Sequence, residues 1–130
     1  MNIKAGTAHN AGTYIYYEVL GNPANETLVL ISGLGSQLVY WTDELCQVFV
    51  DRNFQVVRFD NRDVGLSSKT SGPAQPVSEI LQSEEVDAPY SLSDMAADTI
   101  GILDALEIET AHMMGVSLGG MIAQTLAIEF

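Results

Sequence analysis

Three short apolar runs, separated by segments of helical periodicity, limit the folds open to this chain more than any other feature. The runs are residues 28–31, 55–59 and 111–116. None of them alternates between apolar and polar side chains, which is typical of strands covered on both faces in a parallel sheet. Strands that alternate with helices predict an α/β fold, with a mostly parallel sheet and helices on both of its faces.

Segments with helical spacing of apolar residues follow these runs. Residues 41–51 and 92–108 are expected to form helices, with Thr42 and Ser91 as their N-caps. Residues 118–130 are apolar nearly all round, which predicts a buried helix. Because ligands in such folds bind beyond the carboxyl ends of the strands, chemistry is expected just after each apolar run.

Turn-forming residues mark the rest of the chain. A cluster of them at 9–12 separates two segments, 2–8 and 13–19, that are expected to pair as a hairpin. Residues 68–90 are rich in Ser, Pro and Glu, and are expected to form a long surface excursion with one helical turn near Ile80. No internal repeat or linker interrupts the chain, so its residues are expected to belong to one domain.

Composition and charge exclude several kinds of partner. With 17 Asp and Glu against 5 Lys and Arg, the formal charge of the 130 residues is −12, which repels phosphate backbones and anionic headgroups. We therefore expect no nucleic acid and no membrane among its partners, and no apolar run approaches the roughly 18 residues of a spanning helix. The single cysteine, Cys46, and the absence of an export signal favour a cytoplasmic location.

The charge is unevenly distributed. From Thr70 onward there are ten carboxylates and no Lys or Arg. Such a skew indicates either a solvated acidic face or a surface that a partner complements, and an acidic surface poor in lysine also suits high salt. The sequence leaves these interpretations open.

The strongest chemical signal is the sequence G-V-S-L-G at 115–119, which lies between an apolar strand and an apolar helix. A strand that turns this tightly into a helix has no room for side chains beside the serine, and the turn lifts the hydroxyl of Ser117 above the sheet. The helix N-terminus there offers free N–H groups and a partial positive charge to an oxyanion. The pattern also arises by chance, but its place between strand and helix favours a nucleophile.

Two further clusters follow the other apolar runs. Residues 32–36, S-G-L-G-S, let the backbone fold under a substrate, so that the N–H of Leu34 can point at the same oxyanion as the N–H of Leu118. Alone, such a turn is more often only a turn. The charged segment 60–67 is expected to form a structural network of hydrogen bonds and ion pairs. Residues 40–41, Tyr and Trp, either line a pocket or cap the next helix.

Together these motifs resemble the α/β-hydrolase superfamily, and within it the bacterial serine esterases. The resemblance rests on I-S-G-L-G at 31–35, F-D-N-R-D-V-G-L-S at 59–67 and G-V-S-L-G-G at 115–120. It implies the three-layer fold of that family, with an amino-terminal hairpin and about five strands in the order 1-2-4-3-5. It also implies that segment 60–67 is the structural signature of the family.

The resemblance assigns roles to three residues. Ser117 is expected to be the nucleophile, and the backbone N–H groups of Leu34 and Leu118 are expected to form the oxyanion hole. Two departures from the family pattern are visible in this sequence: Ser32 stands where many members carry His, and Asp63 stands at a usual Gly. Neither departure affects the nucleophile.

The general base of the triad is not evident. The family order is Ser, then an acid, then His, but Ser117 is followed only by Glu129 and by no histidine. On an extended strand, His112 would lie about 16 Å from the serine, and His9 about 19 Å away by the spacing of strands. Neither is expected to act as its base.

The chain is therefore expected to be the amino-terminal portion of an α/β-hydrolase domain, residues 1–130, that ends within or just after the helix following the serine. Strand 111–116 would then lie at an edge of the sheet, which favours pairing with a second copy or a complementing chain.

The predicted function is that of a carboxylesterase, which cleaves small ester substrates through an acyl-enzyme on Ser117. The alternative is a non-catalytic or incomplete fragment that self-associates or needs a complementing half. No cofactor or metal is expected, because the sequence has no phosphate-binding glycine loop and no His/Cys cluster with metal-ligand spacing. The substrate itself stays open.

Overall fold

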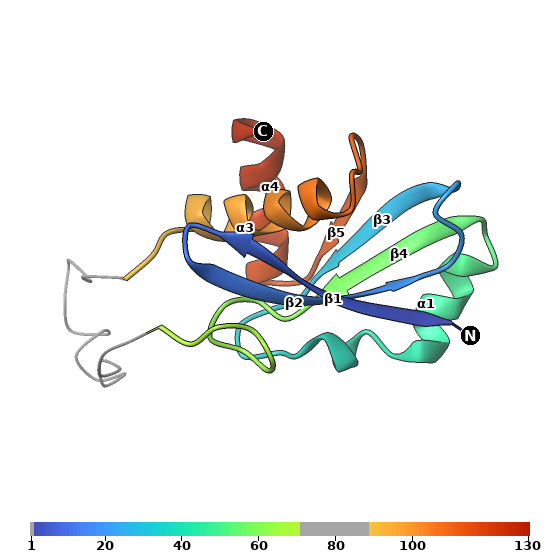
Figure 1. The fold of residues 1–130 in the computed structure, drawn as a ribbon, viewed down its shortest axis with the longest axis horizontal. Helices are drawn as coiled ribbons and strands as arrows, with labels where there is room; N and C mark the ends of the chain where they lie inside the picture. Colours follow the sequence, from blue (N-terminus) through green and yellow to red (C-terminus); the bar gives the residue numbers. More distant parts are fainter. Residues whose placement is uncertain (1, 71–88) are drawn as a thin grey trace.

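A five-stranded sheet with the order β1-β2-β4-β3-β5 forms the middle layer of the fold (Figure 1). The structure, a computed structural model, describes residues 2–70 and 89–130. The strands are β1 (Ile3–Asn10), β2 (Thr13–Leu20), β3 (Glu26–Ile31), β4 (Phe54–Phe59) and β5 (His112–Gly115). β1 and β2 form the predicted antiparallel hairpin, whereas β3 runs parallel to both β4 and β5. The expected strand order is confirmed.

Helices cover both faces of this sheet (Figure 1). They are η1 (Leu38–Tyr40, a 3-10 helix), α1 (Asp43–Val50), α3 (Leu92–Ala105) and α4 (Leu118–Glu129). α3 and α4 lie on one face, and α1 with η1 lies on the other. The α/β prediction is confirmed, although η1 was not expected.

Alternate residues of the central strands supply two separate cores. In β3, Val29 and Ile31 belong to the core under α3 and α4, whereas Leu28 and Leu30 belong to the core under α1. All four side chains are buried. This two-sided burial is the reason why these strands carry continuous apolar sequence.

The predicted helix starts are confirmed. The side chain of Thr42 accepts a hydrogen bond from the N–H of Leu45 at the start of α1, and Ser91 forms a capping box with Asp94 at the start of α3. α3 ends three residues earlier than 108, and Glu107 in the following turn has a left-handed φ of 57°. The helical turn expected near residue 80 lies outside the described residues.

The prediction that residues 118–130 form a buried helix is wrong on one side. Gly119, Ile122 and Leu126 of α4 are buried against α3, β3 and β5. On the opposite side, Met121 is 54% exposed and Ile128 is 84% exposed. No described strand pairs with the outer edge of β5, so nothing in the described residues covers this side of the helix.

Candidate active site

Ser117 occupies the sharp turn between β5 and α4. Its φ of 54° and ψ of −118° lie in a region that residues with a side chain rarely adopt. It is the N-cap of α4, but its hydroxyl caps no backbone N–H of the helix, and the residue is exposed. The turn thus presents a serine hydroxyl to solvent at the N-terminus of a helix, where the helix dipole favours negative charge.

Two glycines make this turn possible. A Cβ atom on Gly115 would overlap the carbonyl oxygen of Gly119, and a Cβ atom on Gly119 would overlap the carbonyl oxygen of Ile31. Both obstacles are backbone atoms, which cannot swing aside as the end of a flexible side chain can. The expectation that the turn has no room for side chains beside Ser117 is confirmed at both positions.

The turn after β3 lies against the turn that holds Ser117. A Cβ atom on Gly33 would lie 3.5 Å from the Cβ atom of Ser117, and the N–H of Val116 donates to the carbonyl oxygen of Ile31 at 3.2 Å. Within residues 2–70 and 89–130, neither the N–H of Leu34 nor the N–H of Leu118 donates to a backbone acceptor in these turns. Two such donors next to a serine are what an oxyanion hole requires.

A pocket of about 340 Å³, which we call the Trp41 pocket, opens beside Ser117. Tyr40 and Trp41 form its aromatic wall, and Val116 and Ser32 lie in its lining. Trp41 is held in place because its Nε1–H donates to the Ser32 hydroxyl oxygen at 3.1 Å. Of the two alternatives for Tyr40 and Trp41, the structure supports a place in the pocket wall.

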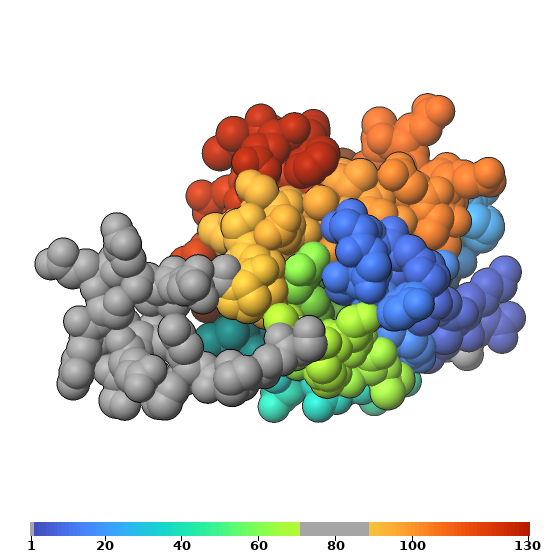
Figure 2. Space-filling model, turned by 60° about the vertical axis from the view of Figure 1, so that its left-hand side comes forward, coloured from blue at the N-terminus to red at the C-terminus, as the bar shows by residue number. Residues whose placement is uncertain are grey.

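A second pocket of about 420 Å³, the Tyr90 pocket, shares Leu34 with the first. Its other lining includes Leu118, Arg62, Asp63 and Tyr90. Figure 2 shows the green segment at 60–70 beside the gold start of α3, the two parts of the chain that form most of this lining. Leu34 therefore stands between two pockets of different chemistry.

Segment 60–67 is structural, as predicted. The Asp60 carboxylate accepts hydrogen bonds from the N–H of Leu38, at 2.7 Å, and the N–H of Leu66, at 2.9 Å. The side-chain amide of Asn61 donates to the carbonyl oxygen of Ser32 at 3.1 Å. Asp60 and Asn61 thereby fix the turn after β4 to η1 and to the turn after β3, the two turns nearest Ser117.

Arg62 and Asp98 form a largely buried ion pair. The sequence predicted ion pairs for segment 60–67 but did not identify Asp98 as a partner. The Nε and Nη2 atoms of Arg62 each lie 2.8 Å from an oxygen of the Asp98 carboxylate. The side-chain amide of Asn10 donates to the same carboxylate at 2.8 Å. Hydrogen bonding to Asp98 raises the pKa of Arg62, although burial acts in the opposite direction. The pair joins the turn after β4 to the middle of α3.

A second buried arginine, Arg58, anchors the opposite face. Its guanidinium lies 2.7 Å from Glu18 on β2 and 2.7 Å from Asp43 at the start of α1, and it also donates to the carbonyl oxygen of Trp41. Burial lowers the pKa of Arg58, but the hydrogen bonds to Asp43 and Glu18 outweigh this effect and raise it. Cys46 lies beside Arg58, fully buried, and burial raises the pKa of its thiol.

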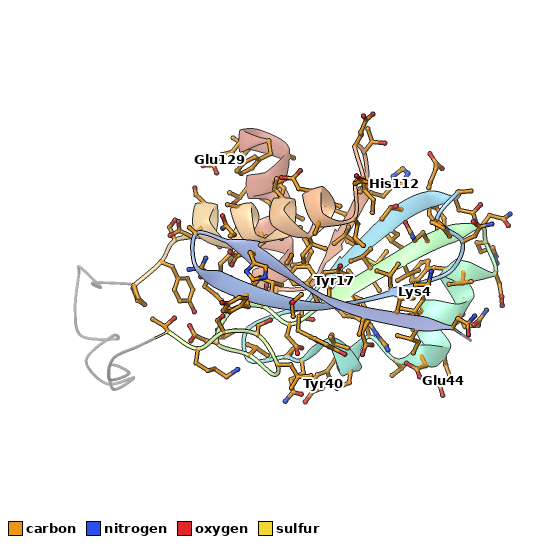
Figure 3. All side chains as sticks on the ribbon, viewed as in Figure 1. Lys4, Tyr17, Tyr40, Glu44, His112 and Glu129 are labelled. Atoms are coloured by element: carbon orange, nitrogen blue, oxygen red, sulfur yellow. The ribbon has the colours of Figure 1, made fainter. Side chains whose placement is uncertain are left out.

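Both histidines lie away from Ser117. His112 begins β5, and its Nε2 atom lies 3.6 Å from Glu26. Figure 3 shows it well apart from Tyr40, which lines the Trp41 pocket. His9 packs edge-on against Tyr14 on the hairpin. Neither histidine lines either pocket. That neither acts as the base stays a prediction.

Two further features of the described residues bear on the kind of site. No group of three His, Cys, Asp or Glu side chains in 2–70 and 89–130 converges as metal ligands would. No helix in this part of the chain is long and apolar enough to cross a membrane.

Comparison with known proteins identifies the family. Residues 26–130 match the family described as the alpha/beta hydrolase fold. With its sheet order, its turn at residue 117 and this match, the chain belongs to the α/β-hydrolase fold family.

Several relatives are similar to this chain over most of its length. It is 33% identical over 115 residues to Rhodomycin D methylesterase DnrP of Streptomyces peucetius, covering 88% of this chain and 34% of that protein. It is 34% identical over 118 residues to the putative carbamate hydrolase RutD of Pantoea ananatis, covering 89% and 37%. A solved hydrolase from Pseudomonas aeruginosa superposes with a TM-score of 0.75 at 31% identity, covering 98% and 41%. The chain spans roughly a third of the length of its curated relatives.

Proposed function

We propose that this chain supplies the nucleophile and the oxyanion hole of a serine hydrolase that cleaves small carboxylic esters. The observation that carries the proposal is the backbone of Ser117, which is held at a positive φ by two glycines that tolerate no side chain. A strained residue at the mouth of a pocket is the arrangement in which nucleophilic serines are found. Similarity to a methylesterase supports an ester as the substrate.

In the proposed reaction, the Oγ atom of Ser117 attacks the ester carbonyl while a base takes its proton. The N–H groups of Leu34 and Leu118 bind the resulting oxyanion. The carbon–oxygen bond to the alcohol then breaks, and the alcohol leaves with the proton from the base. Water attacks the acyl-enzyme by the same route, releasing the acid and restoring the serine hydroxyl.

The base and its acid partner are proposed to lie in polypeptide outside these 130 residues, either farther along the same chain or in a partner chain. Two observations support this: neither histidine lines a pocket beside Ser117, and the curated relatives are about three times as long as the part that this chain covers. Without a base, serine is a weak nucleophile at neutral pH.

Labelling with a fluorophosphonate tests the proposal. The 130-residue chain is treated with the probe with and without imidazole as a diffusible base, and the same measurement is made after a complementing carboxyl-terminal polypeptide is added. The adduct is located by mass spectrometry. We expect a single adduct, on Ser117, at a rate that rises with the added base.

Two variants give the controls for this experiment. Ser117→Ala should abolish labelling, whereas Ser36→Ala, a serine in the lining of the same pocket, should leave it unchanged. An adduct on another residue, or no adduct even with the complementing polypeptide present, would contradict the proposal.

A second candidate function is assembly through the outer side of β5 and α4. The observation that favours it is the exposure of Met114 on β5, at 40%, and of Ile128 on α4, at 84%. An apolar edge strand is a template for pairing with another chain. Light scattering after size exclusion should detect self-association, and Met114→Lys should weaken it. Ile3→Lys is the control, because Ile3 is 39% exposed on the opposite edge of the sheet, and it should leave self-association unchanged. A monomer at every concentration would overturn this candidate.

A further inference from the structure

Ser32, the residue that directly follows β3, carries a buried hydroxyl in the wall of the Trp41 pocket. The residue is 2% exposed and belongs to the pocket lining together with Ser117. Its backbone is held in place because the side-chain amide of Asn61 donates to its carbonyl oxygen. Ser32 is also one of the two positions at which the sequence departs from the family pattern, so that pattern gives its hydroxyl no role.

The hydroxyl of Ser32 accepts a hydrogen bond but donates none within residues 2–70 and 89–130. Its oxygen accepts from the Nε1–H of Trp41 at 3.1 Å. An indole nitrogen is a donor only, so the hydroxyl proton of Ser32 cannot be shared with Trp41. The oxygen is therefore satisfied as an acceptor, while the proton still needs a partner.

The other buried hydroxyls of the described residues all donate. Each gives its proton to an oxygen of a neighbouring strand or turn: Thr27 to Gln55, Ser67 to Asp60 and Thr99 to Met95. A buried donor without an acceptor is costly, and such groups are rare in folded proteins. The exception at Ser32 therefore calls for an acceptor from outside the described residues, and the pocket is where that acceptor can enter.

The proton of Ser32 lies near the reacting centre of the proposed site. A Cβ atom on Gly33, the next residue, would lie 3.5 Å from the Cβ atom of Ser117, and the pocket that both serines line has a volume of only about 340 Å³. A ligand that fills this pocket is within reach of both residues.

The oxygen of Ser32 is held in a fixed place by an anchored partner. The carbonyl oxygen of Trp41 accepts a hydrogen bond from the buried guanidinium of Arg58, and the indole of the same residue binds the Ser32 oxygen. Rotation about the Cβ–Oγ bond is then the freedom that is left to the proton. The rest of the wall includes Tyr40 and Val116, so one oriented donor faces a largely apolar space. Such a donor discriminates strongly, because a ligand that lacks an acceptor leaves it unpaired.

We propose that Ser32 is a specificity-determining residue, whose hydroxyl donates a hydrogen bond to an oxygen that the ester carries a few bonds away from its carbonyl carbon. A keto or an ether oxygen accepts such a proton. An ester without this oxygen leaves the buried donor unpaired and binds less tightly. This inference rests on the proposed function, because it places a second oxygen relative to an ester carbonyl at Ser117.

Two methyl esters of the same shape test the donor. Methyl levulinate carries a keto oxygen on its fourth carbon, and methyl 4-methylpent-4-enoate carries a methylene group in its place. Their affinities are measured from NMR shifts of backbone amides in the Ser117→Ala chain, which lacks the serine hydroxyl and leaves the esters intact. The ratio of the two affinities is compared between variants, because the alkene is the more apolar ligand.

Trp41 reports on the same hydrogen bond. It is the single tryptophan of the chain, so its indole N–H gives one assignable resonance. A hydroxyl that donates becomes a stronger acceptor, since linked hydrogen bonds polarise one another. We expect methyl levulinate to move the Nε1–H proton resonance of Trp41 downfield, and the alkene ester to move it less. A hydroxyl that only supports Trp41 would give the same shift with both esters.

Variants separate the donor from its support. Ser32→Ala should lower the ratio of affinities about fivefold, the effect of one neutral hydrogen bond. Trp41→Phe removes the indole donor but keeps the Ser32 hydroxyl, and should keep the ratio. Ser36→Ala, which removes another hydroxyl from the same lining, should also keep it.

An unchanged ratio in Ser32→Ala, a lost ratio in Ser36→Ala, equal indole shifts with the two esters, or no binding of methyl levulinate would each overturn the inference. If Ser32→Ala does not fold, the indole shifts in the parent chain decide between the two roles of Ser32. Failure of the proposed function is separable, because binding is measured without the serine hydroxyl. Labelling of Ser117 with an unchanged ratio contradicts the inference alone, and a lowered ratio without labelling contradicts the reaction alone.

Discussion

The carboxyl end of the sheet and the outer side formed by β5 and α4 differ in how completely their residues are held or covered by other parts of this chain. At the carboxyl end, backbone contacts fix the turn of Ser117, the Asp60 carboxylate accepts hydrogen bonds from the N–H groups of Leu38 and Leu66, and Arg62 makes two hydrogen bonds to Asp98. On the outer side, Ile128 is 84% exposed. The geometry beside Ser117 therefore arises from contacts inside this chain and does not depend on what covers α4.

The largest effect is expected from one added methyl group at the turn of Ser117. Gly119→Ala places a Cβ atom on the carbonyl oxygen of Ile31 and should cost about 3 kcal/mol or more, or prevent folding. Its neighbour Gly120 is the control, because a Cβ there would meet its nearest atom at 3.5 Å. Gly120→Ala should be neutral or stabilise the helix by up to about 1 kcal/mol. Equal free energies of unfolding in urea would show that the turn is not constrained as described.

The next largest effect is expected at the ion pair under the Tyr90 pocket. Asp98→Ala leaves the guanidinium of Arg62 without its partner and should destabilise the fold by about 3 kcal/mol. Asp104→Ala, on an exposed part of the same helix, should change stability by less than about 0.5 kcal/mol. Similar losses for the two variants, measured by urea unfolding, would contradict the role given to the pair.

A smaller effect is expected from the titration of Tyr90. Burial, and then the hydrogen bond and charge of Asp63, raise the pKa of Tyr90 to about 12 from its usual value of 10.0. Because the folded-state pKa is the higher one, this contribution to stability is complete below pH 10 and is lost as the pH rises to 12. Asp63→Asn should shift the pKa of Tyr90 downward, as measured from the ¹³Cζ resonance of labelled tyrosine. An unchanged pKa of Tyr90 in Asp63→Asn would show that the Asp63 carboxylate does not act on the Tyr90 hydroxyl.

The smallest change in stability is expected on the outer side. Ile128→Ser removes an apolar side chain that is 84% exposed, so the free energy of unfolding should change by less than about 0.5 kcal/mol. Its effect should appear instead as weaker self-association in light scattering. A loss as large as that of Asp98→Ala would mean that α4 is covered after all, and the contrast between the two regions would disappear.

Local patterns predicted the parts of the fold that depend on neighbouring residues. Apolar runs without alternation predicted β3, β4 and β5, since burial on both faces leaves no polar side. The spacing of Gly115 and Gly119 predicted a turn with no room for side chains, because only glycine escapes the clash with backbone oxygens. The strand order came from the family resemblance.

The features that the sequence did not predict join residues far apart in the chain. Nothing near Arg62 indicates that its partner is Asp98, which lies within the apolar stripe of a helix. The Tyr90 pocket likewise depends on four segments, at 33–35, 61–64, 90–95 and 118, that only the folded sheet brings together. The exposure of α4 was missed because helical periodicity reports which positions are apolar, and not what covers them. An acidic residue in an apolar stripe is the one signal that could have pointed to a buried ion pair.

The proposed site requires Ser117, Leu34 and Leu118 to act together on one reacting carbon. The most direct measurement is a crystal structure of the chain after reaction with a fluorophosphonate. We expect phosphorus bonded to the Oγ atom of Ser117, with one phosphoryl oxygen roughly 2.7–3.1 Å from the backbone nitrogens of both Leu34 and Leu118. A phosphoryl oxygen that points into solvent, or an adduct on any other side chain, would contradict it.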